Sequence, residues 1–389
     1  MYQTLKIVAD AHIWGVESAF STLPGYDVEL NILESREITR DTVIDADILL
    51  TRSSTKVQAK LLQGTAVRFA ATATVGDDHY DKAWLESNNI RWASAAGSST
   101  GSVIEYMISS LLDLHEKKLI SIPDTTIGII GVGRIGHEME KLCRAMGMKV
   151  MLNDPPRERA EKLSGFSSLE EILEQADLIT LHTPLVIEGE ECTKHLLNRE
   201  RLKQFRGKGI MNAARGSCID NGALLGWLNG HSSRFAALDC WELEPSPAQA
   251  LFSHAQMAIA TPHIAGHSLD GKAANTQFIY QALCHVLQTQ PVWNKNEHLP
   301  QDAAPHVLST TGDCWEKLHT ACNFLYPLCK DSETMKSWSS LSHNELSDAF
   351  TCYRRHYPIR RAWQHTALHF SHPDPGTLQL AQAIGIKLV

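Results

Sequence analysis

Short apolar runs alternate with amphipathic stretches from the N-terminus to about residue 290. The short runs between polar turns predict strands, and the stretches between them have the spacing of helices with one buried face. Strand and helix in repeated alternation are typical of parallel βα units. In the first hundred residues the predicted strands are Leu5–Val8, Ala46–Leu50, Val67–Ala71 and Ile90–Trp92.

The same rhythm restarts near residue 125. A long helix-like stretch, Ser102–Leu119, comes just before it, and we expect this helix to link two domains because its apolar spacing fits one buried face. The pattern therefore predicts an α/β protein with two Rossmann-like, doubly wound parallel-sheet domains around a cleft. The strands predicted for the second sheet are Thr126–Ile130, Lys149–Asn153, Leu178–His182, Gly209–Asn212, Phe235–Asp239 and Met257–Ala260.

The chain changes character after residue 290, where prolines recur. Two helix-like stretches, Cys314–Leu328 and Leu346–Tyr353, lead into a basic run at Tyr353–Arg361. We interpret the arginines of this run as solvated or interface charge, with a contribution to a partner subunit's site as the alternative. The predicted domains are residues 1–100, completed by about 268–290; residues 101–267; and a small α+β domain over residues 291–389.

Composition excludes several classes of function. The 389 residues suffice for two or three domains, and 43% hydrophobic with 21% charged content is ordinary for a soluble globular protein. A net charge of −8 leaves no basic surplus for a nucleic-acid partner. Apolar runs stay shorter than the ~18–20 residues of a membrane-spanning helix. The nine scattered cysteines include no Cys-x-x-Cys pair, which favours neither a disulfide framework nor a metal site, and we expect a cytoplasmic protein.

The segment Gly131-Val-Gly-Arg-Ile-Gly136 follows an apolar run and opens the helix-like stretch Arg134–Met146. In a dinucleotide-binding turn the first glycine permits the tight turn, the second lets the pyrophosphate approach the backbone, and the third lets helix and strand pack closely. The helix N-terminus supplies free N–H groups. We therefore expect Gly131, Gly133 and Gly136, with Arg134 and Ile135 between them, to bind a dinucleotide.

The choice of dinucleotide depends on the end of the next predicted strand. Asp154 stands there, where a carboxylate accepts hydrogen bonds from the adenosine ribose and disfavours a 2′-phosphate. The position predicts NAD rather than NADP. Arg157 lies close by and is the argument against, because an arginine can accommodate that phosphate.

Three residues downstream stand in distinctive contexts: Arg215 in Asn-Ala-Ala-Arg-Gly, Glu244 in Trp-Glu-Leu-Glu-Pro, and His263 in Thr-Pro-His-Ile-Ala-Gly. A guanidinium grips a carboxylate through two parallel hydrogen bonds. An imidazole takes a hydroxyl proton as hydride leaves for a nicotinamide, and a carboxylate orients that imidazole. Each residue alone is also typical of an ordinary loop, but their combination and order predict a site that oxidises a hydroxy acid.

Further polar residues follow predicted strands. Asp239 is expected to hydrogen-bond the nicotinamide carboxamide, with a strand-terminal turn as the alternative. Thr183 is expected to contact the cofactor's ribose or phosphates, with a turn hydroxyl before a proline as the alternative. The run Arg52-Ser-Ser-Thr-Lys56 offers donors and positive charge for a substrate phosphate, and its alternative is a solvated turn.

These motifs resemble the D-isomer-specific 2-hydroxyacid dehydrogenases, and within them the erythronate-4-phosphate dehydrogenase branch, nearly from end to end. The resemblance implies that Arg215, Glu244 and His263 are catalytic and that the protein is a homodimer that acts on a small phosphorylated hydroxy acid with NAD. It implies further contacts at two groups of positions. The cofactor contacts are Asp154, Thr183, Ala213, Ala214, Asp239 and Gly266, and the substrate contacts are Arg52, Ser53, Thr74 and His267.

Departures from the branch lie on the substrate side. His267 stands where the branch has a substrate-contacting Tyr, Ala96 and Ser99 replace its usual Pro and Asn, and Ala11-His12 replaces an acidic-Asn pair. Two alternatives therefore stay open. One is a dehydrogenase or reductase for a different 2-hydroxy acid. The other is a dinucleotide-sensing binding protein, similar to the corepressors that share this scaffold.

Overall fold

The structure, a computed structural model, describes residues 2–162 and 165–389. They divide into two compact units. Unit 1 comprises the N-terminal residues through Gly101 together with Ser268–Gln301, and unit 2 comprises Ser102–His267 together with Asp302–Val389. Each unit is therefore assembled from two separate stretches of chain.

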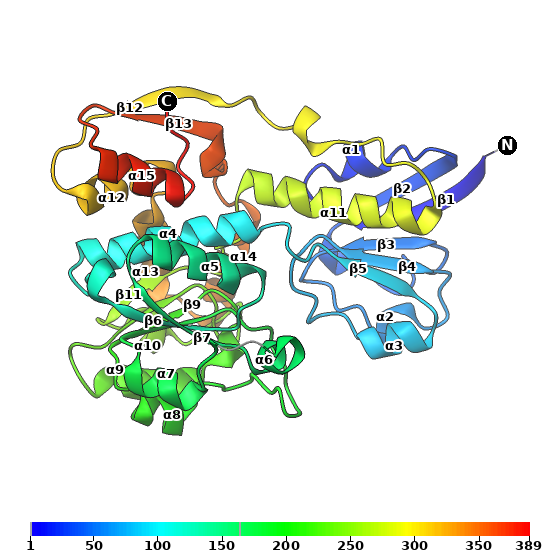
Figure 1. Cartoon of the computed structure of the whole chain (residues 1–389). Helices are drawn as coiled ribbons and strands as arrows, with labels where there is room; N and C mark the ends of the chain where they lie inside the picture. Colours follow the sequence, from blue (N-terminus) through cyan, green and yellow to red (C-terminus); the bar gives the residue numbers. More distant parts are fainter. Residues whose placement is uncertain (1, 163–164) are drawn as a thin grey trace. The chain divides into compact units, whose positions relative to one another are not determined.

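Unit 1 is a parallel sheet of strand order β2-β1-β3-β4-β5. Helices α1 and α11 cover one face and α2 and α3 the other (Figure 1). The central strands β3 and β4 are buried throughout because helices cover both faces. The elements are β1 Gln3–Asp10, α1 Val16–Phe20, β2 Tyr26–Leu33, β3 Ile48–Thr51, α2 Ala59–Leu62, β4 Phe69–Thr72, α3 Lys82–Ser87, β5 Arg91–Ser94 and α11 Leu269–Leu287.

Unit 2 contains a second parallel sheet, of order β11-β10-β9-β8-β6-β7. The strand order reverses between β6 and β8, which is where open α/β sheets bind ligands. Its elements are α4 Thr100–Glu116, β6 Thr126–Ile130, α5 Arg134–Ala145, β7 Lys149–Asn153, α6 Pro155–Glu161, α7 Leu169–Gln175, β8 Leu178–Leu181, α8 Arg199–Gln204, β9 Gly209–Asn212, α9 Asn221–Asn229, β10 Phe235–Leu238, α10 Gln249–Phe252 and β11 Met257–Ala260.

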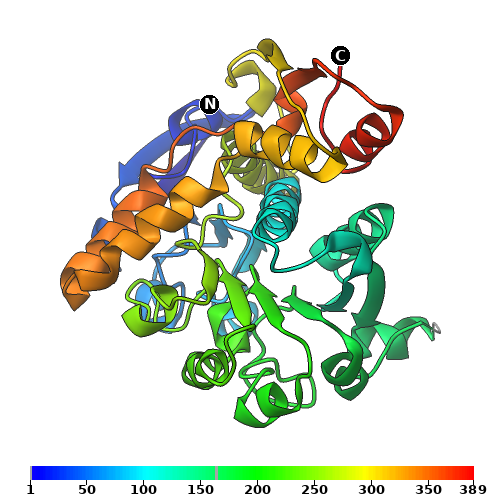
Figure 2. The same ribbon diagram turned by 90° about the vertical axis from the view of Figure 1, so that its left-hand side faces the viewer.

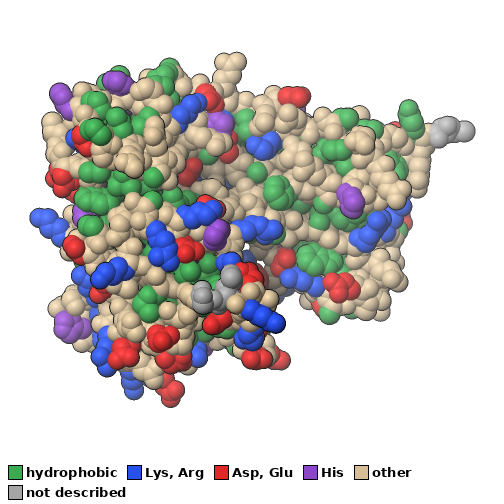
Figure 3. Space-filling model, viewed as in Figure 1, with side chains coloured by type: hydrophobic (Ala, Val, Ile, Leu, Met, Phe, Trp, Pro, Cys, Tyr) green, Lys and Arg blue, Asp and Glu red, His purple; other side chains and the backbone are tan. Residues whose placement is uncertain are grey.

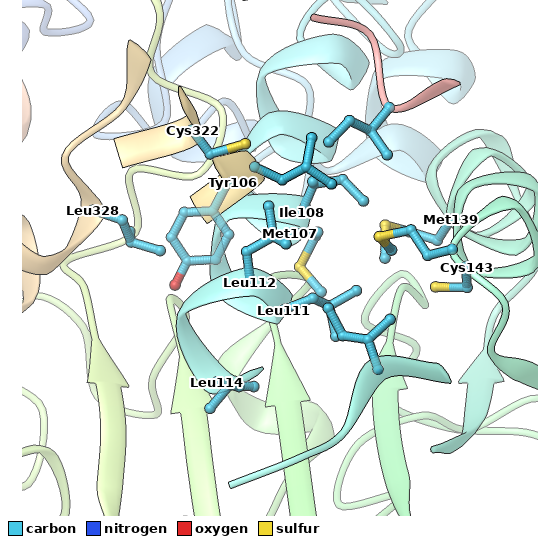
Figure 4. Close-up of a cluster of buried hydrophobic side chains, with 14 of the residues drawn as sticks. Tyr106, Met107, Ile108, Leu111, Leu112, Leu114, Met139, Cys143, Cys322 and Leu328 are labelled. Atoms are coloured by element: carbon cyan, nitrogen blue, oxygen red, sulfur yellow. The ribbon is translucent and has the colours of Figure 1, made fainter. Parts of the chain in front are cut away.

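Helix α4 forms the centre of the largest core of unit 2 (Figure 4). Its side chains Tyr106 and Leu111 are buried. They belong to one cluster with Met139 of α5 and with Cys322 of the C-terminal segment, Asp302–Val389. Burying a large apolar side chain stabilises a fold by about 1.5–3 kcal/mol. Helix α4 thus joins the C-terminal segment to the nucleotide-binding sheet through a shared core.

The C-terminal segment adds a two-stranded parallel sheet, β12–β13, and four helices. The helix predicted over Cys314–Leu328 ends earlier, at Leu325, and Pro327 separates it from a second helix that begins at Leu328. Helices α13 and α14 lie side by side (Figure 2), where the ring of Trp338, just after α13, contacts that of Tyr353. The bounds are β12 Ala303–Leu308, α12 Cys314–Leu325, α13 Leu328–Ser337, α14 His343–Arg355, β13 Thr366–Phe370 and α15 Pro375–Ala383.

The predicted fold class is confirmed: both sheets are parallel and helices alternate with their strands. Each predicted strand has an observed counterpart: β6, β7, β9 and β11 have the predicted bounds, and the ends of the others differ by at most two residues. Strand β2 was not predicted. None of the described helices meets the length and hydropathy required to span a membrane. On the face of unit 2 shown in Figure 3, acidic and basic side chains are interspersed rather than gathered into a basic patch.

Candidate active site

Five loops of unit 2 that carry predicted site residues leave the same edge of one sheet. Strands β6, β8, β9, β10 and β11 are parallel, so their carboxyl ends share that edge. The loops that follow these strands carry the fingerprint glycines, Thr183, Arg215, Asp239 and His263, in that order. The fold therefore brings nucleotide-binding and candidate catalytic residues to one edge.

The glycine turn between β6 and α5 requires glycine at two positions for steric reasons. Gly131 has φ +85°, and a Cβ there would lie 2.8 Å from the backbone of His182. A Cβ on Gly136 would lie 2.0 Å from the carbonyl oxygen of Gly131. At Gly133 nothing lies within 4 Å of an added Cβ. The turn is thus tightly packed on its inner side and open at the N-terminus of α5, where a pyrophosphate would bind.

Asp154 is bound to that turn. One carboxylate oxygen accepts the Val132 N–H at 2.8 Å, and the other caps α6 by accepting the Arg157 N–H at 3.1 Å. The Arg157 guanidinium pairs with Glu161 at 2.6 Å and donates to the Val132 carbonyl at 2.7 Å. These contacts engage Arg157 within unit 2 and weaken the argument that it serves a 2′-phosphate.

Glu244 and His263 form a close pair. The His263 Nδ1 lies 2.7 Å from the Glu244 Oε2, and the Trp241 N–H donates to the other carboxylate oxygen at 2.8 Å. Burial by itself raises the pKa of Glu244, but His263, Arg354 and the Trp241 N–H outweigh burial and lower the pKa below its usual value. The carboxylate is therefore charged at neutral pH and keeps the Nδ1 engaged, which leaves the Nε2 for a substrate.

Two local contacts fix the backbone around Arg215. Its carbonyl accepts the Asn212 side-chain N–H at 2.9 Å, and the following Gly216 packs so closely on Trp241 that a Cβ would lie 2.0 Å from that residue's carbonyl. Cys240 lies beside the Glu244–His263 pair: its thiol sulfur, a Glu244 oxygen and a His263 ring nitrogen lie within 4.8 Å of one another. Burial raises the Cys240 pKa well above its usual value, while the Arg215 charge opposes that rise.

Asp239 is buried and supports the loop that carries His263. Its carboxylate accepts hydrogen bonds from the Thr261 hydroxyl at 2.7 Å, the Ile264 N–H at 2.7 Å and the Ala265 N–H at 2.9 Å. Burial raises the pKa of Asp239, and His263 and these donors offset part of the rise. The predicted contact with a nicotinamide carboxamide stays a prediction, and the observed contacts give Asp239 a structural role in the loop.

The other predicted cofactor contacts lie in these same loops. The Thr183 hydroxyl is 3.5 Å from the Cys218 sulfur and follows β8 beside the glycine turn. Ala213 and Ala214 follow β9, and the Ala214 N–H donates to the Asn212 side chain at 2.9 Å. Gly266 lies in the turn closed by the His267 N–H and the Ile264 carbonyl, at 2.7 Å.

The predicted substrate residues Arg52, Ser53 and Thr74 belong to unit 1. Arg52 and Ser53 follow β3, and Thr74 follows β4, so the loops leave the same edge of the unit 1 sheet. The Thr74 hydroxyl donates to the Gly76 carbonyl at 2.9 Å.

The departing positions other than His267 also lie in unit 1. His12 pairs with Glu34 at 2.9 Å, and Ser99 is buried. The fourth predicted substrate residue, His267, belongs to unit 2 and lies four residues after His263.

Comparison with known proteins places this geometry in a family. The family described as D-isomer specific 2-hydroxyacid dehydrogenase, NAD binding domain, matches residues 112–265. Erythronate-4-phosphate dehydrogenase of Hydrogenovibrio crunogenus is 39% identical over 92% of this chain and 92% of its own length. The enzyme of that name from Pseudomonas savastanoi pv. phaseolicola is 38% identical over 99% of this chain and its own whole length. The chain belongs to the erythronate-4-phosphate dehydrogenase family.

Solved structures support the fold of this family member. A 3-phosphoglycerate dehydrogenase of Entamoeba histolytica aligns with a TM-score of 0.61 at 21% identity, over 73% of this chain and 96% of that one. An NAD-dependent formate dehydrogenase of Staphylococcus aureus aligns with a TM-score of 0.59 at 24% identity, over 75% of this chain and 98% of that one. The family and the glycine turn together identify this protein as an NAD-dependent oxidoreductase.

The residues present fit NAD. The open position at Gly133 leaves backbone room for a pyrophosphate, and the Asp154 carboxylate stands at the end of β7 for the ribose hydroxyls. Bound NAD supplies a hydride acceptor.

Sequence reasoning misjudged the C-terminal basic run. The interpretation of the run as solvated or interface charge is wrong as to solvation for Arg360, which is buried and paired with the buried Glu105 of α4. It also missed Arg354, whose Nε donates to the carbonyl of His263 at 3.1 Å. The two members of that contact lie 91 residues apart in sequence, so no local pattern could have indicated it.

Proposed function

We propose that this protein oxidises 4-phospho-D-erythronate with NAD to (R)-3-hydroxy-2-oxo-4-phosphooxybutanoate. The single observation that carries the chemistry is the 2.7 Å contact between Glu244 and His263 at the edge of the nucleotide-binding sheet. The names of the relatives, which match over nearly their whole length, support the substrate.

His263 acts as the acid–base group in this proposal. Its Nε2 takes the proton of the C2 hydroxyl while the C2 hydride passes to the nicotinamide, so the substrate loses one proton and one hydride. Glu244 holds the ring through the Nδ1 and favours the imidazolium that forms. The guanidinium of Arg215 binds the substrate carboxylate through two parallel hydrogen bonds.

Phosphate recognition is assigned to the loops of unit 1. Arg52 supplies positive charge and the Ser53 hydroxyl donates a hydrogen bond, while Thr74 contacts the substrate from the loop after β4. His267 keeps a donor at the position where the branch has a Tyr. We propose that the departures at Ser99 and His267 are tolerated because each leaves hydrogen-bonding capacity, with Ser99 offering a hydroxyl and a backbone N–H.

The wider assignment follows from the same relatives. We propose that the protein works in the cytoplasm in pyridoxine 5′-phosphate (vitamin B6) biosynthesis and is a homodimer. We propose that residues 291–389 form the dimerisation domain, residues 1–100 with about 268–290 the substrate domain, and residues 101–267 the NAD-binding domain.

The test is NADH formation from NAD with 4-phospho-D-erythronate, compared with 3-phosphoglycerate, glycerate and D-lactate. A parallel reaction contains a 2-oxoacid to reoxidise bound NADH. The proposal predicts the highest kcat/KM for 4-phosphoerythronate. Preference for another acid would keep the proposed chemistry and change the substrate. Tight NADH binding without turnover of any acid would favour a dinucleotide-sensing binding protein.

A further inference from the structure

His263 holds an unfavourable backbone conformation. Its φ of +55° lies in the left-handed region, which a non-glycine residue holds only where its surroundings fix it. Its N–H donates to the Asp239 carbonyl at 2.7 Å. Its carbonyl accepts the Arg354 Nε–H at 3.1 Å. Both sides of this residue are thus held by groups distant in sequence.

Arg354 is well placed for this contact. It lies in the last turn of α14, is half-buried, and its guanidinium is 5.8 Å from the centre of the Phe350 ring. The next residue, Arg355, carries the same charge in the same turn but is exposed. The chain therefore offers a matched control one residue away.

A second contact joins the same two segments. The ring of Tyr357 meets that of His267 edge to face, with centroids 5.9 Å apart. The segment 353–357 is in turn bound to α13. The hydroxyls of Tyr353 and Tyr357 each donate to the carboxylate of Asp331, both at 2.6 Å. The segment 353–357 is therefore held to α13 while it contacts the loop 263–267 at both ends.

The charge of Arg354 also supports the Glu244–His263 pair. Burial opposes the charged form of Glu244, and the Arg354 charge is among the groups that lower the pKa of that carboxyl. Arg354 thus supports both members of the pair: the backbone of His263 by a hydrogen bond and the carboxylate of Glu244 by its charge.

We propose that Arg354 is a positioning residue for His263, and that the segment 353–357 holds the loop 263–267 in its reactive conformation. The C-terminal segment then contributes to turnover within one chain, in addition to any role in assembly. This inference rests on the proposed proton-transfer role of His263. It assigns no contact between Arg354 and the substrate.

The test compares Arg354→Gln, Arg354→Lys and the control Arg355→Gln. Arg354→Gln is expected to lower kcat by about 10- to 100-fold, the effect of losing one hydrogen bond that involves a charged group. KM and the Kd for NADH should change far less, because the substrate and cofactor contacts remain. Arg354→Lys keeps the charge and should recover part of the loss, whereas Arg355→Gln should match the wild type.

Hydrogen exchange of the backbone amides in 261–267 supplies a readout that needs no substrate. Arg354→Gln should speed exchange there and Arg355→Gln should not. Wild-type exchange and kcat in Arg354→Gln, or an equal loss in Arg355→Gln, would overturn the inference. If the wild type turns over none of the acids, the proposed function fails instead, and the exchange comparison alone decides whether Arg354 holds the loop. If Arg354→Gln does not fold, Arg354→Lys decides by the same two readouts.

Discussion

Replacing Glu244 with glutamine removes one charge from the candidate catalytic pair and keeps the shape of the side chain. The wild-type contact is a 2.7 Å hydrogen bond between a half-buried carboxylate and His263. Hydrogen bonds to charged groups contribute about 1.5–3 kcal/mol, and about 1.4 kcal/mol corresponds to a factor of ten in rate. We therefore expect kcat to fall by about 10- to 100-fold.

The assay is steady-state NADH formation, with the Kd for NADH measured by fluorescence. The Kd should stay near the wild-type value because Glu244 is expected to act on the imidazole rather than on the nucleotide. Because the pKa of Glu244 lies below its usual value, the wild-type carboxylate stays charged as the pH falls from neutral to 6, so protonation of Glu244 does not contribute to any change of wild-type kcat over that range.

The sequence supplies a matched control two residues earlier. Glu242 also pairs with a histidine, His195, at 2.7 Å, but that pair is separate from His263. Glu242→Gln should retain kcat within a few-fold. If Glu244→Gln kept the wild-type kcat, or if both variants lost it equally, the reasoning that Glu244 supports the proton transfer would be refuted.

Three further predictions follow from named contacts. His263→Ala should lose most turnover while NADH binding changes little; near-wild-type turnover would remove its acid–base role. Arg52→Ala should raise KM for the phosphorylated acid far more than for an unphosphorylated analogue, and equal effects would remove Arg52 from the phosphate site. Glu105→Ala leaves Arg360 buried without its partner and should lower the free energy of unfolding by about 3–5 kcal/mol in a denaturant titration; a loss below 1 kcal/mol would contradict the buried pair.

The sheets were predictable where a strand is buried on both faces, because such strands are short continuous apolar runs. Strand β3 is buried at every position and was predicted. Strand β2 pairs with only one neighbour at the sheet edge and alternates between exposed and half-buried positions. Its pattern is therefore weaker, and it was missed. In the C-terminal segment the helix predicted to reach Leu328 ends at Leu325, because Pro327 lacks the backbone donor that would continue it.

The candidate site was predictable as a set of local motifs but not as a set of contacts. The glycine turn, Arg215, Glu244 and His263 each carry their signal within a few neighbouring residues. The partners that hold them do not. Glu105 and Arg360 lie 255 residues apart, and charged residues in a polar stretch look solvated until their partner is known. Tertiary pairing, rather than local pattern, therefore decides the role of the basic run.

The central claim is that this chain moves the C2 hydride of 4-phosphoerythronate to NAD with His263 as the proton acceptor. The most direct measurement uses substrate labelled with deuterium at C2 and follows the label by mass spectrometry in wild type and His263→Ala. The account predicts deuterium in the NADH and a 2-oxo acid phosphate from the wild type, with little of either from the variant. NADH without the label, or equal product from both proteins, would contradict it.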